Sequence, residues 1–300
     1  MSEFQVNESV AWLGLGRMGT AMAARLIESA KEVAVWNRTP DKCDPLVRNG
    51  VVRLARAEDS ANYDVVFSTV LDDTALLDVV KLALGTAGAK PRVWIDGSTV
   101  SPEAAAKAAA IAQDVGVSYV SAPVSGNPGV VAEGKAIFAI SGAAEGLDIA
   151  ERICLAIGRR VFRVGGGVEA NVVKLCTNAL LAVTMQSVAE IAVLADSAGV
   201  KRSSLMEFIN DSAIGSAFTR YKTANITSLE FPPTFTPEGQ RKDIRLAIDL
   251  AQQFEVPMPV LNTAEVAFSR LVSGGLGEGR DFAALILEVA RDAGRELTPE

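Results

Sequence analysis

The stretch Val10-Ala11-Trp12-Leu13-Gly14-Leu15-Gly16-Arg17-Met18-Gly19 decides the fold of the first half of the chain. An apolar run leads into a Gly-x-Gly-x-x-Gly spacing, and a segment of helical periodicity follows. Gly14 permits a tight turn, Gly16 lets the backbone approach a pyrophosphate, and Gly19 allows the helix to pack closely on the strand. The amino end of that helix offers N–H donors and a partial positive charge to phosphate groups. The stretch therefore predicts a strand–loop–helix unit that binds a dinucleotide.

Beyond this unit, short β-branched runs alternate with segments of helical periodicity. We expect strands at residues 10–13, 32–36, 64–69, 92–96, 117–121, 136–140 and 160–164. Helices are expected between them at residues 20–29, 73–84, 102–114 and 145–157. This alternation is typical of the α/β class, so we predict a Rossmann-type, doubly wound parallel sheet.

The pattern changes after Gly165-Gly166-Gly167. Residues 168–197 contain neither proline nor glycine and are apolar on every face, which predicts one long, buried helix. Further helices are expected at residues 203–210, 237–254, 260–272 and 281–292. We therefore predict a Rossmann domain of residues 1–165 and an all-α domain of residues 166–300, joined by the long interdomain helix.

The composition excludes several classes of function. The chain has 300 residues, no histidine, and a net charge of −7 from 29 Lys and Arg against 36 Asp and Glu. Without histidine, Ser-His-Asp hydrolysis, Cys-His proteolysis and HExxH zinc chemistry are ruled out. The acidic balance disfavours general nucleic-acid binding. Three scattered cysteines make neither a disulfide framework nor a four-cysteine metal site, and we expect Cys154 and Cys176 in the core.

Neither the opening residues nor the longest apolar window indicates secretion or membrane insertion. The opening residues MSEFQVNES are polar and lack the apolar stretch of a signal peptide. The longest apolar window, residues 179–194, is interrupted by Gln186, Ser187 and Glu190, which makes it short of a membrane span. We expect a cytoplasmic protein with neither a nucleic acid nor a membrane as partner, and with no metal.

The end of the second strand indicates which dinucleotide is bound. Asn37 lies 18 residues past Gly19, where an NAD site has an acid for the ribose 2′-hydroxyl. Here that acid is missing, and Arg38 is adjacent. A carboxylate would repel a 2′-phosphate, whereas a guanidinium binds a phosphate and stacks on adenine. The sequence therefore indicates NADP(H). The alternative is that Arg38 is only a surface charge.

A nicotinamide cofactor implies hydride transfer, and interconverting an alcohol and a carbonyl also moves a proton. Histidine is absent, and the Tyr-x-x-x-Lys arrangement is absent too. Four residues after Tyr63, Tyr119 and Tyr221 stand Phe67, Pro123 and Asn225. Lysine is the leading remaining candidate for the proton carrier.

Lys174 lies early in the long helix, and Asn171 and Asn178 share its face by their spacing. A polar stripe on an apolar helix is costly to bury without a purpose. A protonated lysine donates to a carbonyl oxygen, and burial would lower its pKa so that it also accepts. Asn178 would hold the ammonium or the substrate hydroxyl. Taken alone, the stripe is equally well explained as a solvated or interdomain face.

These motifs, in this order along nearly the whole chain, resemble those of the β-hydroxyacid dehydrogenase family, which includes 3-hydroxyisobutyrate dehydrogenases and glyoxylate/succinic semialdehyde reductases. Val70-Leu71 falls where the family has a Leu-Pro pair over the cofactor, and Asp96-Gly97-Ser98-Thr99 is similar to its Asp-x-Ser-Thr segment. Phe235 with Lys242-Asp243 resembles its Phe…Lys-Asp element. The predicted cofactor residues are Gly14, Leu15, Gly16, Arg17, Met18, Gly19, Asn37, Arg38, Thr39, Val70, Leu71, Thr99 and Lys242.

The resemblance also implies the substrate and the assembly. Ser125, Gly126, Asn127 and Thr99 would bind a small carboxylate-bearing substrate, and Lys174 with Asn178 would form the Lys-x-x-x-Asn catalytic pair. The implied reaction is hydride transfer between NADP(H) and a small 3-hydroxyacid or its semialdehyde or oxo acid. The helical domain would dimerise through the long helix, giving a homodimer or a dimer of dimers.

One departure concerns the substrate loop, which runs Ser125-Gly126-Asn127-Pro128-Gly129 where the family usually has a second glycine after Ser-Gly. Asn127 and Pro128 either favour a smaller or more polar acid or reflect turn chemistry.

Two other functions stay open. An imine reductase is a relative of similar fold, but such enzymes usually lack the lysine found here at position 174. A non-catalytic NADP-binding scaffold would have no need for Lys174, Asn178, Thr99 and Lys242 together.

Overall fold

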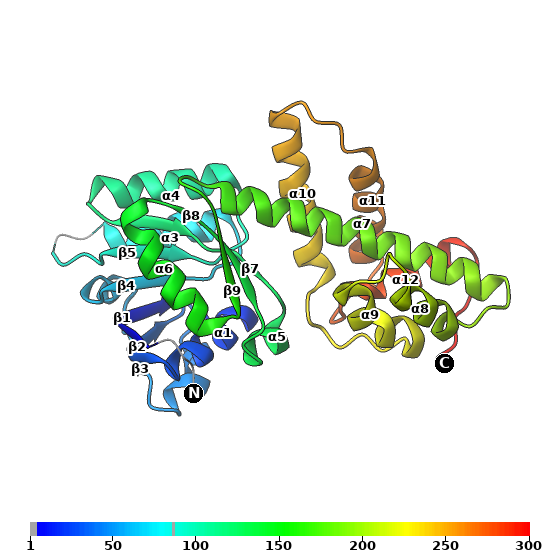
Figure 1. Cartoon of the computed structure of the whole chain (residues 1–300), viewed down its shortest axis with the longest axis horizontal. Coiled ribbons are helices and arrows are strands. Elements are labelled where there is room, and N and C mark those ends of the chain that lie inside the picture. Colours follow the sequence, from blue (N-terminus) through cyan, green and yellow to red (C-terminus); the bar gives the residue numbers. More distant parts are fainter. Residues whose placement is uncertain (1–4, 86–87) are drawn as a thin grey trace. The chain divides into compact units, whose positions relative to one another are not determined.

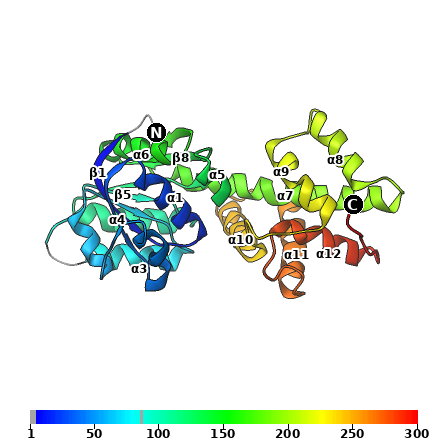
Figure 2. The same cartoon turned by 90° about the horizontal axis from the view of Figure 1, so that it is seen from below.

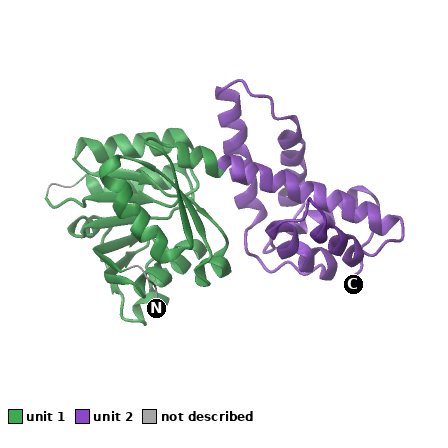
Figure 3. Cartoon of the chain, in the orientation of Figure 1, with its two compact units in different colours: residues 1–174 green, residues 175–300 purple. Residues whose placement is uncertain are grey.

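The computed structural model describes residues 5–85 and 88–300, so residues 1–4 of the polar opening lie outside the described residues. The chain divides into two compact units, Met1–Lys174 and Leu175–Glu300 (Figure 3). The division falls inside α7 (Glu169–Ser197), whereas the sequence suggested residue 165, before this helix begins.

Unit 1 is built on one sheet with the strand order β3-β2-β1-β4-β5-β6-β8-β7, and β9 pairs with β8 (Figure 1). The strands are β1 (Val6–Leu13), β2 (Ala30–Trp36), β3 (Val52–Arg53), β4 (Val65–Ser68), β5 (Val93–Asp96), β6 (Ser118–Ser121), β7 (Val124–Ser125), β8 (Ile137–Gly142) and β9 (Arg160–Gly165). From β3 to β6 all neighbours are parallel, while β8 is antiparallel to β6 and β7. The order reverses between β1 and β4, and the carboxyl ends of strands at such a point are where α/β sheets bind ligands.

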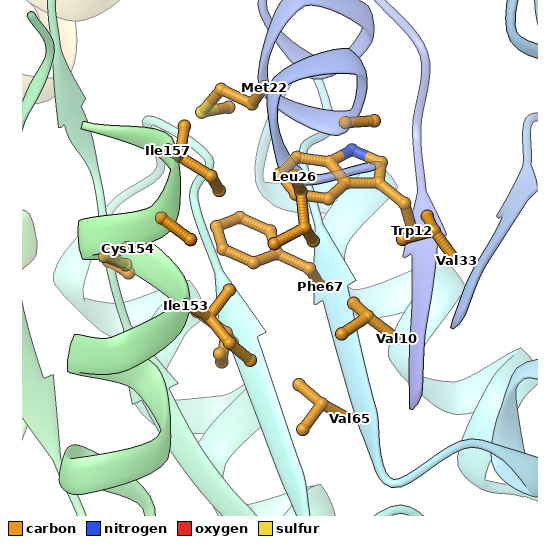
Figure 4. Packing of buried hydrophobic residues seen from close by; sticks show 14 of the residues in the cluster. Val10, Trp12, Met22, Leu26, Val33, Val65, Phe67, Ile153, Cys154 and Ile157 are labelled. Carbon is orange, nitrogen blue, oxygen red and sulfur yellow. The ribbon is translucent and has the colours of Figure 1, made fainter. Parts of the chain in front are cut away.

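Helices cover both faces of this sheet, because β1, β4 and β5 are apolar on both sides. On one face, α1 (Arg17–Ile27) and α6 (Ala144–Ile157) pack on a cluster in which the rings of Trp12 and Phe67 stack 4.1 Å apart (Figure 4). On the other face, α3 (Asp73–Leu84) and α4 (Pro102–Asp114) enclose Trp94 and its neighbours. The α/β prediction is confirmed.

The sequence patterns did not predict the shortest elements of unit 1. They are the strands β3 and β7, the helices α2 (Asp44–Val47) and α5 (Pro128–Ala132), and the 3-10 turns η1 (Pro40–Cys43) and η2 (Ala57–Asn62). A two-residue strand or a single helical turn is too short to show a hydrophobic period, so sequence patterns do not reveal it.

Unit 2 is helical, as the sequence predicts. After α7 come α8 (Arg202–Asp211), α9 (Ala217–Ser228), α10 (Pro237–Gln253), α11 (Pro259–Ser273), η3 (Phe282–Ala284) and α12 (Leu285–Asp292). Helix α8 packs against α9, and α10 against α11 (Figures 1 and 2). Helix α9 was not predicted, because its threonines and asparagine have low helix propensity. A reciprocal cap between Ser216 and Thr219 starts it.

Two burial expectations were wrong. Helix α7 is not buried all round, since Leu180 and Leu194 are 67% and 68% exposed. The sequence predicts that the window of residues 179–194 is too short for a membrane span, whereas the whole helix α7 is long and apolar enough for one by length and composition alone; core helices of soluble proteins meet the same test. Cys154 is buried, but Cys176 is exposed. The reason is the helix turn: Leu175 faces the core, and the next residue points about 100° away.

Candidate functional site

The glycine loop has the geometry of a phosphate cradle. Gly14 has φ +99°, and a Cβ there would lie 2.2 Å from the carbonyl oxygen of Thr69. A Cβ on Gly19 would lie 2.1 Å from the carbonyl oxygen of Gly14, so neither position accepts a side chain. A Cβ on Gly16 would meet nothing within 4 Å. The loop is therefore closed toward the protein and open at Gly16, where α1 begins without a side-chain cap.

Asn37 acts on this loop from the end of β2. Its Oδ1 accepts a hydrogen bond of 2.8 Å from the backbone N–H of Leu15, and its Nδ2 donates to the carbonyl oxygen of Thr39 at 2.9 Å. The sequence predicted Asn37 only as a cofactor residue, and the structure adds that it fixes the loop. Arg38 is exposed and has no hydrogen-bond or ion-pair partner within residues 5–85 and 88–300, so its guanidinium is available to a ligand.

The segment after β4 lies against the glycine turn. A Cβ on Gly14 would be 3.4 Å from Val70 Cγ1, which shows that these two predicted cofactor residues are neighbours. The backbone N–H of Val70 donates to Ser98 Oγ at 2.9 Å. Leu71 is 72% exposed, an unusual position for a large apolar side chain. The structure thus brings the glycine loop, Val70 and the Ser98-Thr99 segment to one edge of the sheet.

A buried carboxyl lies under this edge. Asp96 is fully buried, and its Oδ1 accepts hydrogen bonds of 2.7 Å from both Ser68 Oγ and Ser98 Oγ. Burial raises the pKa of Asp96, and the two serine hydroxyls oppose that change only in part. Thr99 follows Ser98 directly and is half-buried.

The predicted substrate loop follows β7. Ser125 is half-buried at the end of this strand, and Gly126 has φ +145°, which favours glycine. Asn127 Oδ1 accepts a hydrogen bond of 3.0 Å from the N–H of Val130 and caps α5. Of the two explanations that the sequence left open for Asn127, this contact supports turn chemistry, since the side-chain oxygen is used within the loop.

Helix α7 carries the predicted catalytic pair. Lys174 is half-buried, and Asn178 lies one turn further along the same face. Asn178 Nδ2 donates to Oδ2 of the buried Asp243 at 2.6 Å, and Gln240 Nε2 donates to the Asn178 carbonyl oxygen at 2.8 Å. Asn178 is therefore held rigidly by α10.

Asp243 is a functional candidate to which the sequence analysis gave no role of its own. Besides Asn178, its carboxylate pairs with Lys242, whose Nζ lies 2.9 Å from Asp243 Oδ1. One buried carboxylate thus orders two predicted site residues. A signal was present in the sequence: an acid directly after the predicted cofactor lysine, on the apolar side of a helix.

The predicted residues consequently form two groups. Unit 1 holds the glycine loop with Asn37, Val70 and the Ser98-Thr99 segment, and unit 2 holds Asn178 with Lys242. Lys174 is the last residue of unit 1, four positions before Asn178 on one continuous helix. Within residues 5–85 and 88–300, no cluster of acidic or cysteine side chains could hold a metal ion.

Comparisons with known proteins identify the family of the chain. Residues 9–166 match the family model for the NAD binding domain of 6-phosphogluconate dehydrogenase, and residues 169–289 match that for NAD-binding of NADP-dependent 3-hydroxyisobutyrate dehydrogenase. The chain is 32% identical over 280 residues to glyoxylate/succinic semialdehyde reductase 1 of Arabidopsis thaliana, which covers 92% of this chain and 96% of the relative.

Two solved structures share the fold of the chain. The 3-hydroxyisobutyrate dehydrogenase of Mycobacterium tuberculosis, determined with L-serine, superposes with a TM-score of 0.84 at 25% identity, over 94% of this chain and 98% of that chain. An imine reductase from Pseudomonas sp. shares the fold, with a TM-score of 0.63 at 21% identity, over 94% of this chain and 99% of that chain.

Proposed function

The chain belongs to the β-hydroxyacid dehydrogenase family, and we propose that it transfers hydride between NADP(H) and a small 3-hydroxyacid or the corresponding semialdehyde or oxo acid. It is an oxidoreductase with a nicotinamide cofactor. The observation that carries the proposal is the polar face of α7, where Asn178 is anchored by the buried Asp243 one turn from Lys174.

The residues at the edge of the sheet fit a dinucleotide. A pyrophosphate would occupy the open side of the loop at Gly16 and receive N–H groups from the start of α1. Val70 and Thr99 would border the nicotinamide end. When bound, the cofactor supplies or accepts the hydride, and the protein supplies orientation and the proton.

Three features support NADP(H) over NAD(H). The acid that binds a ribose 2′-hydroxyl is absent, and Asn37 uses its amide within the protein instead. Arg38 beside it is exposed, with its guanidinium available to a 2′-phosphate. Thr39 is exposed next to it and adds a hydroxyl. We expect NADPH to bind more tightly than NADH, which a fluorescence titration with each cofactor measures.

Lys174 is the proposed proton carrier. In the reductive direction its ammonium donates a proton to the substrate carbonyl oxygen, and in the oxidative direction its neutral amine removes the proton from the hydroxyl. Because Asp243 accepts from Asn178 Nδ2, the acceptor left on this side chain is Oδ1. Asn178 therefore orients a donor, either the Lys174 ammonium or the substrate hydroxyl.

The substrate carboxylate would bind at Ser125 and at the backbone N–H of Gly126. The φ of +145° at Gly126 allows the backbone to turn there, and the cap made by Asn127 fixes the loop. A fixed donor pair of this kind contributes by orientation, which is how remote binding groups support catalysis.

The function is tested with a panel of small substrates: glyoxylate, succinic semialdehyde and a cyclic imine, each with NADPH and with NADH, and 3-hydroxyisobutyrate with NADP+ and with NAD+. We expect turnover of a carboxylate-bearing substrate with NADPH and none of the imine. Lys174→Ala should lower kcat about 10²–10⁴-fold with little change in the Kd for NADPH, because it removes the proton carrier alone.

Cys176→Ser is the matched control for that variant, since it changes an exposed position two residues away on another face of α7. Wild-type turnover by Lys174→Ala would contradict the assigned role, and turnover of the imine alone would favour an imine reductase.

We also propose that the protein forms a homodimer through unit 2. The support is the exposed apolar surface of this unit: Leu180 and Leu194 on α7, and Phe208 and Ile214 beside a cavity of about 500 Å³ at α8. Exposed apolar side chains that gather around a groove mark an interaction site, whereas single exposed ones do not. Light scattering should give twice the chain mass, and a monomer at micromolar concentration would contradict the proposal.

A further inference from the structure

A row of polar side chains crosses the carboxyl ends of three neighbouring strands of unit 1. Ser68 on β4, Asp96 on β5 and Ser121 on β6 are register partners, so their side chains lie side by side on one face of the sheet. All three are buried. Residues two positions earlier on β5 and β6, Trp94 and Tyr119, belong to an apolar core cluster. The row is therefore the last layer of the core before the loops at the edge of the sheet.

Two serines donate to the same oxygen of Asp96, and each also accepts a hydrogen bond from a different part of unit 1. Ser68 Oγ and Ser98 Oγ each donate to the same oxygen, Asp96 Oδ1, at 2.7 Å. Ser68 Oγ then accepts from Trp94 Nε1 at 2.9 Å, which is a contact inside the core. Ser98 Oγ accepts from the backbone N–H of Val70 at 2.9 Å, which is a contact to the predicted cofactor segment. We call these two chains of hydrogen bonds from Asp96 the two arms. The Ser68 arm ends at Trp94 in the core, and the Ser98 arm ends at Val70.

The carboxyl fixes the direction of both arms. A serine hydroxyl has one proton, and when Asp96 Oδ1 receives it the lone pairs remain for the other partner. The backbone N–H of Ser98 also points to Oδ1, at 3.3 Å. Asp96 therefore holds the Ser98 backbone and directs the Ser98 lone pair at Val70 at once, so one group sets the distance between two segments that leave different strands.

The other carboxyl oxygen, Asp96 Oδ2, has fewer hydrogen bonds than Oδ1. Asp96 Oδ2 makes no hydrogen bond of ordinary geometry with the described residues, and the buried Tyr119 hydroxyl lowers the pKa of Asp96 less than the two serines do. The interactions of the carboxyl are thus concentrated on Oδ1, the oxygen that reaches the loops. Burying a carboxyl is costly, and the hydrogen bonds from Ser68 Oγ, Ser98 Oγ and the Ser98 N–H that offset this cost are all accepted by Oδ1.

We propose that Asp96 is a positioning residue for the nicotinamide cofactor, acting through Ser98 to hold the Val70 segment and the Ser98-Thr99 segment at a fixed separation. The inference rests on the proposed function, because both segments are assigned to the cofactor there. Asp96 itself is fully buried, so it acts through the residues that it contacts.

The paired serines supply the experiment. Ser98→Ala removes the arm that reaches Val70, and Ser68→Ala removes the matched arm that ends at Trp94. Each variant is titrated with NADPH by fluorescence, and its thermal unfolding is recorded. We expect Ser98→Ala to raise the Kd for NADPH about three- to tenfold, the value of one hydrogen bond that orders the site. Ser68→Ala should leave that Kd within about twofold while lowering stability, because a buried indole N–H loses its acceptor.

Ser98→Thr keeps the hydroxyl and should restore most of the affinity. An unchanged Kd in Ser98→Ala, or an equal rise in Ser68→Ala, would overturn the inference while leaving the proposed function intact. Failure of the wild-type protein to bind NADPH and NADH would overturn the proposed function and the inference together. If Asp96→Asn folds, its Kd should rise at least as much as that of Ser98→Ala, and a wild-type Kd would again be contradictory.

Discussion

The two units bury an aspartate in opposite ways. In unit 1, Asp96 is fully buried with no cation beside it among residues 5–85 and 88–300, and serine hydroxyls hold it. In unit 2, Asp281 is equally buried but forms an ion pair with the buried Lys222, with 2.5 Å between Oδ1 and Nζ. In the first arrangement the donors to Asp96 Oδ1 are hydroxyl and backbone groups next to the candidate site. In the second arrangement both carboxyl oxygens have partners. The comparison shows that hydroxyl and backbone donors hold Asp96 without a counter-charge, whereas a buried cation holds Asp281.

The ion pair in unit 2 ties together segments that are distant in sequence. Asp281 Oδ2 accepts from Thr234 Oγ1 at 2.5 Å and from the N–H of Phe235 at 3.1 Å. The Lys222 ammonium also lies 4.5 Å from the centre of the Phe282 ring. Helix α9, the segment before α10 and η3 are thus joined at one point. A buried pair offsets its desolvation cost only when it has such additional partners.

The largest expected effect on stability follows from breaking this pair. Asp281→Asn should lower the free energy of unfolding by about 3–5 kcal/mol, because it leaves the Lys222 ammonium buried without a counter-charge. Urea unfolding followed by circular dichroism measures the change.

The matched control is Asp292→Asn, which removes one partner of the pair between Arg270 and Asp292, both about half exposed. Its expected effect is below about 1 kcal/mol, as for surface ion pairs in general. Equal losses in the two variants would mean that the buried pair has no special role in unit 2.

A smaller expected effect concerns the pH dependence of the free energy of unfolding, to which Asp281 and Asp96 contribute with opposite signs. Burial raises the pKa of Asp281, but the ion pair with Lys222 and the hydrogen bonds outweigh it, so the pKa is lowered. Its stabilising effect is present above the ordinary aspartate pKa of about 4 and is lost as pH falls. The pKa of Asp96 is raised by burial, so this residue favours the folded state most below pH about 4 and less as pH rises.

Relative to the wild type, the stability of Asp281→Asn should therefore fall less steeply between pH 7 and pH 3, and that of Asp96→Asn more steeply. Unfolding free energies at a series of pH values measure both slopes. Deviations of the same sign in the two variants would contradict the comparison.

The fold of unit 1 could be predicted because its signals are local. The glycine spacing after residues 10–13 and the β-branched runs report on their own neighbourhood, and the sheet follows from alternation. Helix α9 could not be predicted, because the contacts that hold it join Lys222 to Asp281, 59 residues away. The exposed side of α7 was also missed, since an all-apolar sequence does not tell whether its own chain covers it.

The candidate site likewise contains residues that the sequence predicts and contacts that it does not predict. Lys174, Asn178 and the glycines were found from residue types and spacing, which chemistry and helix geometry constrain directly. The anchoring of Asn178 by Asp243 spans 65 residues, and the contact of Asn37 with Leu15 spans 22. Such contacts are set by how elements pack, and a single sequence does not record them.

The double use of Asn37 limits how the cofactor preference of this protein can be redesigned. An aspartate there would supply the acid of an NAD site, but it would lose the donor that Asn37 offers to the carbonyl of Thr39 and set a negative charge against that oxygen. The glycine loop, tied to the same side chain through Leu15, would move with it. Arg38 carries no such duty in the described structure, so protein engineers who want to exchange one coenzyme for another should begin at that position and leave its neighbour unaltered.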